Sequence, residues 1–186
     1  MKKILLLLTF LLITQTNFAG TPYSRYLRSW NLISRLCSEL TENANIITHS
    51  PNHIAITNFA VNFNKKVGVL IINQNNLINL ITHRGFKDNH FLNTYRIMQQ
   101  NLADLKKILM DNRPLIDNLK LPNFNSAEIY NAIDFKAYEN DELIRATAHN
   151  KGNKAFKHNV INNLTQGVIL LNECRSKVAA LYSKIK

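Results

Sequence analysis

Apolar residues recur along most of this chain at alternating steps of three and four, the spacing that places them on one face of an α-helix. Five stretches follow the pattern. Their apolar positions are Tyr26, Trp30, Ile33, Cys37 and Leu40; Ile56, Phe63, Val67, Leu70, Leu77 and Ile81; Phe91, Tyr95, Met98, Leu102, Leu105 and Leu109; Tyr130, Ile133, Ala137 and Ile144; and Val160, Leu164, Gly167, Leu171, Cys174, Val178, Leu181 and Ile185. The sequence therefore predicts an all-α fold, a bundle of four or five helices.

No segment alternates with period two for long enough to indicate a strand. The best candidate, residues 67–72, is a continuous apolar run with helical patterning on both sides. Gly68 and Gly167 lie inside strong helical segments, where glycine is a poor helix former. We interpret both as places where two helix backbones approach closely, with a ligand cleft as the alternative.

Proline, glycine and small polar residues mark the expected helix ends. Thr21-Pro22 and Ser50-Pro51 each offer a capping hydroxyl followed by proline at the first helical position. Gly85 follows a basic last turn and predicts a helix stop, while residues 125–128 have the spacing of a capping box. Residues 151–153, Lys-Gly-Asn, predict a break before the last helix, and one long kinked helix from residue 126 to the end is the alternative.

The first twenty residues have the pattern of a secretory signal peptide. Lys2 and Lys3 precede the apolar run of residues 4–13, and a polar stretch ends at Ala19 and Gly20. A membrane anchor is the alternative, but ten apolar residues cover only about half of the roughly 20 that a span needs. We predict a signal peptide over 1–20, a single domain over 21–186, and export to the periplasm or the medium of a bacterium, since the chain is rich in Asn, Ile and Lys.

The chain is strongly basic. Its formal net charge is +11, and it falls to +9 without Lys2 and Lys3. Near the C-terminal end lies a basic cluster of Arg145, Lys151, Lys154 and Lys157, whose lysines would form a stripe if a helix continued through Gly152. Such a stripe would attract the phosphates of anionic lipid or lipopolysaccharide, and a solvated helix face is the alternative. Nucleic acid fits less well, because Phe156 is the only aromatic residue interleaved with the cluster.

Cys37 and Cys174 are the two cysteines of the chain, and both fall on apolar helix faces. If the helices alternate in direction, the first and last run parallel and the two residues lie at a similar height. Because export would make oxidation available, we predict a Cys37–Cys174 disulfide, with two buried reduced thiols as the alternative.

Candidate catalytic chemistry is sparse. Asp134, Glu139, Asp141 and Glu142 cluster in the fourth stretch, where an acid pair is conceivable, but ion pairs of Asp141 and Glu142 with Arg145 on a solvated face explain them more simply. His49 and His53 are four residues apart, but the Ser50-Pro51 helix start separates them. The common metalloprotease, P-loop, dinucleotide and hydrolase motifs are absent, so the sequence predicts no catalytic site, metal or cofactor.

Three functional hypotheses remain. The first is an exported, non-enzymatic helical bundle that acts through protein–protein contact, as an envelope, secretion-associated or host-directed factor. The second is a binder of anionic envelope surface through the basic C-terminal region, which salt would release. The third is a small hydrolase, which would need a pocket where carboxylates converge.

Overall fold

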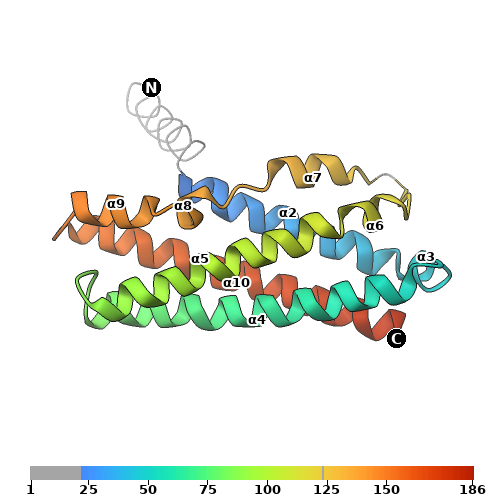
Figure 1. Ribbon diagram of the computed structural model, residues 1–186, viewed down its shortest axis with the longest axis horizontal. Helices are drawn as coiled ribbons and strands as arrows, with labels where there is room; N and C mark the ends of the chain where they lie inside the picture. The colour runs from blue at the N-terminus through green and yellow to red at the C-terminus, as the bar shows by residue number, and fades with distance from the viewer. Residues whose placement is uncertain (1–21, 123) are drawn as a thin grey trace, which may run out of the picture.

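The computed structural model describes residues 22–122 and 124–186, and this part of the chain is entirely helical apart from its connections (Figure 1). The predicted all-α class is confirmed. The helices are α2 (Pro22–Glu42), α3 (Ala44–Thr48), α4 (His53–His83), α5 (Asn89–Asp111), α6 (Arg113–Asp117), α7 (Ser126–Ala132), α8 (Lys136–Glu139), α9 (Glu142–His149) and α10 (Lys154–Ile185).

Four long helices, α2, α4, α5 and α10, form the body of the molecule. Helix α10 packs along both α4 and α2, α4 also packs along α5, and the short helix α8 contacts both α2 and α5. Helices α2 and α10 run in the same direction, because Ser34 contacts Glu173 and Thr41 contacts Lys177. Figure 1 shows α4 running against them, which brings the α4–α5 and α9–α10 connections to the same end.

The core follows the predicted apolar faces. Every position named for the first, second, third and last stretches is buried, and in the fourth only Ile144 is partly exposed. A group of aromatic rings fills the region beneath α8. Tyr26 packs edge-on against Trp30 and lies 4.3 Å from Tyr138 between ring centroids, and Phe135 lies 4.9 Å from Trp30.

Two of the predicted helix ends are close to the observed ones. Helix α4 begins at His53 rather than at Pro51, because the Ser50 hydroxyl accepts from the Asn52 N–H at 3.2 Å and holds a turn ahead of the helix. The predicted stop at Gly85 is confirmed. Gly85 has φ +75°, and its N–H donates to the Leu80 carbonyl at 3.0 Å, closing the last turn of α4.

The fourth stretch differs from the prediction. Helix α7 begins at Ser126 as expected, but the capping box is wrong: the Asn125 side chain makes no cap hydrogen bond, and Glu128 instead lies 3.8 Å from Arg35. The stretch is interrupted at Ile133 and again at Asp141, so three short helices replace one. Gly152, at φ +87°, separates α9 from α10, which confirms the predicted break and excludes the long kinked helix.

The predicted disulfide is wrong for this structure, which holds Cys37 and Cys174 as free, buried thiols. Their predicted proximity is nevertheless present. A hydrogen bond with Cys174 is the largest cause that raises the pKa of Cys37, followed by burial of the thiol. The Cys174 thiol itself is directed to the Trp30 carbonyl oxygen at 3.7 Å. The alternative of two buried thiols that fill core space matches this arrangement.

The predicted signal peptide, residues 1–20, lies outside the described residues, so cleavage and export stay predictions. None of the helices in the described ranges is both long enough and apolar enough to cross a membrane.

Candidate anion-binding pocket

A pocket opens at the end of the molecule where the α4–α5 and α9–α10 connections meet. It has a volume of about 460 Å³. Both connections contribute to it, together with the last turns of α9, one residue of α5 and the first turn of α10. The lining residues are Arg84, Gly85, Phe86, Lys87, Leu92, Ile144, Thr147, Ala148, Asn150, Lys151, Gly152, Asn153, Lys154 and Lys157.

Two left-handed glycines shape the walls of this pocket. Gly85 turns the chain out of α4, and Gly152 turns it between α9 and α10; a side chain would strain the backbone at either position. Asn153 then begins α10 as its N-cap, with its side-chain oxygen accepting from the Phe156 N–H at 3.1 Å. The two connections are thus fixed by local backbone chemistry rather than by apolar periodicity.

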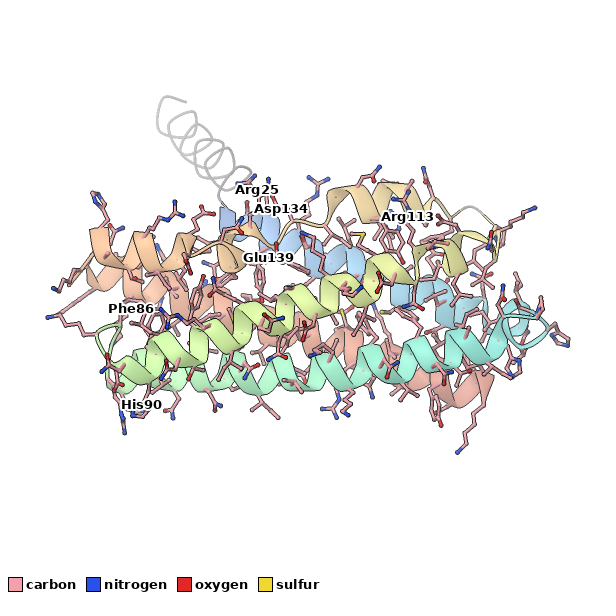
Figure 2. All side chains as sticks on the ribbon, in the orientation of Figure 1. Arg25, Phe86, His90, Arg113, Asp134 and Glu139 are labelled. Atoms are coloured by element: carbon pink, nitrogen blue, oxygen red, sulfur yellow. The ribbon has the colours of Figure 1, made fainter. Side chains whose placement is uncertain are left out.

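The inner wall is apolar. Phe86, Leu92 and Ile144 line the pocket, are partly buried, and pack against the hydrophobic core. The Phe86 ring is held between Phe91 and Phe156, with centroid separations of 5.3 and 5.8 Å. Figure 2 shows Phe86 at this end of the molecule. The pocket therefore has a fixed apolar floor.

The rim is basic. Five basic side chains line the pocket, and no carboxylate does. Two of the five have protein partners: Lys157 donates to the Thr82 carbonyl at 3.1 Å, and Arg84 lies 3.4 Å from the Asp88 carboxylate. Lys87, Lys151 and Lys154 are exposed and form no ion pair with any residue that the structure describes. These three ammonium groups, called the rim lysines below, are free to meet an anion.

Asp88 lies next to the rim and forms its ion pair with Arg84 rather than with a rim lysine. Its carboxylate accepts from the His90 N–H at 2.7 Å and caps α5. That hydrogen bond, and then the Arg84 guanidinium beside it, hold the pKa of Asp88 below its usual range. The Asp88 carboxylate thus caps α5 and also pairs with Arg84 at the end of α4. We therefore interpret Arg84 as a residue that stabilises the α4–α5 connection.

The basic cluster predicted from sequence is partly assembled here. Lys151, Lys154 and Lys157 line the pocket, whereas Arg145 lies exposed on α9 and does not. The condition for a helical stripe is not met, since the helix does not continue through Gly152. The lysines converge because a turn folds the chain around the cavity.

The acidic cluster predicted as a possible hydrolase site is not assembled. Asp134 pairs with Arg25 at 3.3 Å, and both residues are labelled in Figure 2. Glu139 pairs with Lys106 at 3.3 Å, while Asp141 accepts from Gln99 at 3.1 Å. These three carboxylates thus have separate partners, and none of the four acidic residues lines the pocket. The predicted ion pairs of Arg145 with Asp141 and Glu142 are also not formed. Nor do His, Cys, Asp and Glu side chains of the described residues gather in threes that could hold a metal ion.

Sequence reasoning missed the α4–α5 half of the pocket. Arg84, Phe86, Lys87 and Leu92 lie far from Lys151 in the sequence, and only the direction of the helices brings them together. The available signal was the glycine that ends each preceding helix, flanked by basic residues in both connections. With alternating helix directions, these two turns fall at the same end.

A second concave surface lies between α4 and α10. This groove, of about 680 Å³, is lined by small and apolar residues together with Lys65 and Arg175. Two of its apolar side chains are well exposed, Val61 at 46% and Ile72 at 60%. Gly68 lies in the groove beneath the Arg175 guanidinium, with no backbone of another helix near it.

Comparison with known proteins gives no match: no family model, no curated protein and no solved structure resembles this chain. The chemistry of the site therefore stands on its own geometry. Its lining combines basic, apolar and uncharged polar side chains, so charge attraction, apolar contact and hydrogen bonding are what these side chains offer.

Proposed function

We propose that this protein is a non-enzymatic binder that captures an anionic group at the basic end of the helical bundle. The observation that carries this proposal is that five basic residues, from two connections and the first turn of α10, line one pocket that no carboxylate lines. An anionic envelope surface, the alternative partner considered from the sequence, would present such groups.

The physical basis is cumulative. An exposed charge pair contributes only about 0.2–1 kcal/mol, so a single lysine would not define a site. Three rim lysines around one concave surface act on the same anion, and the low-dielectric apolar floor concentrates their field. The attraction should weaken steeply with salt, because exposed charges are screened over about 10 Å at 0.1 M ionic strength.

The test is binding to vesicles of phosphatidylglycerol mixed with phosphatidylcholine, measured by co-sedimentation. The mature protein should be retained at low salt, released at high salt, and not retained by phosphatidylcholine alone. The triple variant Lys87→Gln/Lys151→Gln/Lys154→Gln should lose most of this retention, because it removes the charges of the rim and little packing.

The matched control removes the same charge elsewhere. Arg28, Lys136 and Arg145 are exposed, lie outside the pocket, and have no ion pair in the described ranges. The variant Arg28→Gln/Lys136→Gln/Arg145→Gln should keep most of the binding. Equal weakening by both triple variants would show that net charge alone drives retention, and would overturn the pocket as the site.

A second candidate is protein–protein contact through the α4–α10 groove. Exposed Val61 and Ile72 flank a surface with small residues, and Lys65 and Arg175 lie in it without a carboxylate. This combination fits an amphipathic helix of a partner that carries acidic residues beside its apolar face.

A designed amphipathic peptide with leucines on one face and glutamates at its borders tests the groove. Its fluorescence anisotropy should rise with the wild-type protein and much less with Ile72→Glu, which places a negative charge against the peptide. A peptide with lysines in place of the glutamates is the control and should bind weakly. Equal binding of the two peptides would exclude the charge complementarity.

A further inference from the structure

We propose that the pocket takes an amphipathic anion: a phosphate or carboxylate head held by the rim lysines, with one short apolar chain lying over Phe86, Leu92 and Ile144. This inference rests on the proposed function and specifies its ligand.

The floor and the size of the pocket exclude a bare inorganic anion as the best fit. A volume of about 460 Å³ falls in the range of roughly 300–1,000 Å³ that small organic ligands occupy. A phosphate ion at the rim would leave the apolar floor in contact with water. An attached alkyl chain would displace that water and add the favourable burial of its methylenes.

The head would be placed at the mouth of the pocket. Lys151 and Lys154 come from the α9–α10 side and Lys87 from the α4–α5 side, so lysines line the pocket on both sides. Each is a compact charge with three donors on a flexible stem, which suits a tetrahedral phosphate or a carboxylate without requiring one fixed geometry. Lys157 already donates to the Thr82 carbonyl, so we place it in the lining of the pocket rather than among the groups that hold the head.

The alkyl chain of the ligand would lie against a part of the pocket whose polar side chain already has a hydrogen-bond partner within the protein. The Thr147 hydroxyl donates to the Ile144 carbonyl at 2.7 Å, and Phe86 is fixed by its two aromatic neighbours. Ala148 is exposed and small, which leaves the side of the pocket formed by α9 open. The same chemistry could come from a free amphiphile or from a lipid that stays in a bilayer.

Titration calorimetry with inorganic phosphate, butyl phosphate, hexyl phosphate and octyl phosphate tests whether the alkyl chain of a ligand enters the pocket. Each methylene that enters the pocket should tighten binding by about fourfold, until the chain outgrows the cavity. Ala148→Phe should fill the pocket and remove most of this dependence on chain length without changing the charge. Ala180→Phe, at an exposed position of α10 outside the pocket, is the matched control and should bind as the wild type does.

The two sources are separated by repeating the vesicle experiment with Ala148→Phe. Parallel loss of octyl phosphate and vesicle binding supports a lipid whose chain enters the pocket from the bilayer. Loss of octyl phosphate binding alone supports a free amphiphile. Circular dichroism melting of both phenylalanine variants checks that the fold is intact.

Two outcomes overturn the inference, and they differ in what they leave standing. If the affinity did not change from inorganic to octyl phosphate while binding still depended on the rim lysines, the proposed apolar chain of the ligand would be refuted. The proposed capture of an anion would then still stand. No binding of any phosphate or of anionic vesicles would refute both.

Discussion

The four long helices and the segment from Arg113 to His149 are attached to the core in different ways. Helices α4 and α10 have 31 and 32 residues, and each buries a regular series of side chains along its whole length. The segment instead contains four helices of five, seven, four and eight residues. It contacts α2 through α7 and α8, and it contacts α5 through α6 and α8.

These contacts are chemically distinct. Phe135 and Tyr138 enter the aromatic group around Tyr26 and Trp30, and both are fully buried. Ser29 of α2 accepts from the Asp134 N–H at 2.7 Å. Such short helices are not stable alone, so the segment depends on these anchors, whereas the long helices share their stabilisation over many positions. The difference implies that the segment should open before the long helices do.

The largest expected effect comes from removing the main anchor. Phe135→Ala should lower the free energy of unfolding by about 3–5 kcal/mol, since it leaves a cavity beside Trp30. Native-state hydrogen exchange should show the loss first in amides of α7, α8 and α9, because the segment loses its deepest contact.

Leu70→Ala is the control within a long helix, at a position that is fully buried. Its cost should be about 2–5 kcal/mol, but exchange should rise across α4, α5 and α10 together. If Phe135→Ala also raised exchange uniformly, the segment and the long helices would form one cooperative unit and the contrast would be wrong.

The second prediction concerns the polar anchor. Ser29→Ala leaves the Asp134 N–H without its side-chain partner beside a fully buried position of α2, and should cost about 1–3 kcal/mol in urea unfolding. Ser183→Ala is the matched control, because the Ser183 hydroxyl is exposed and donates only to the Ala179 carbonyl of its own helix. Its effect should stay within about 0.5 kcal/mol. Similar costs for both variants would deny Ser29 an anchoring role.

The same contrast explains what the sequence could and could not reveal. The apolar face of a long helix repeats its spacing many times along the chain. The burial of the apolar positions named between Tyr26 and Leu40 and between Val160 and Ile185 was therefore predicted correctly. In the segment the chain leaves the helix at Ile133, and Asp141 adopts φ +53°, so the helical phase is reset twice. One continuous pattern therefore missed Phe135 and Tyr138. The sequence identified the basic residues on the α9–α10 side of the pocket but not those on the α4–α5 side. The two connections are brought to the same end by the directions of the helices, which the periodic pattern does not reveal.

Glycine shows that even the long helices hold features that periodicity does not reveal. Gly167 and Gly68 were both interpreted as close backbone approaches, but the atoms nearest to a Cβ at either position belong to side chains. A Cβ at Gly167 would lie 2.8 Å from Gln74 Oε1 and 3.2 Å from Tyr26 Cε1, so side chains occupy the space. A Cβ at Gly68 would meet only the Arg175 guanidinium, at 3.7 Å.

The third prediction is that alanine at these two glycines has opposite effects. Gly167→Ala should destabilise by about 1–3 kcal/mol, because the buried Gln74 amide, bonded to the Tyr26 hydroxyl, must move. Gly68→Ala should stabilise by about 0.5–1 kcal/mol through helix propensity alone. Thermal melting of the two variants measures both. Stabilisation by both variants would mean that helix propensity, rather than space, decides at these positions, and destabilisation by both would mean that space is also lacking at Gly68.

The smallest expected effect lies at the border between α2 and α10, where polar contacts remain partly open to solvent. Glu173 accepts from Lys177 Nζ at 2.6 Å and from the Ser34 hydroxyl at 2.8 Å, and these two hydrogen bonds, in that order, lower the pKa of the Glu173 carboxyl. A lowered pKa in the folded state stabilises the protein at pH values above the unfolded pKa of about 4.3, and this contribution disappears as the pH falls through the folded pKa.

Glu173→Gln should therefore reduce the free energy of unfolding by less than about 1 kcal/mol near neutral pH and by nothing in strong acid. Urea midpoints of both proteins at the two pH values measure this. A loss that persists in acid would show that Glu173 acts by packing against α2, and that this border resembles the Ser29 anchor more than a solvated ion pair.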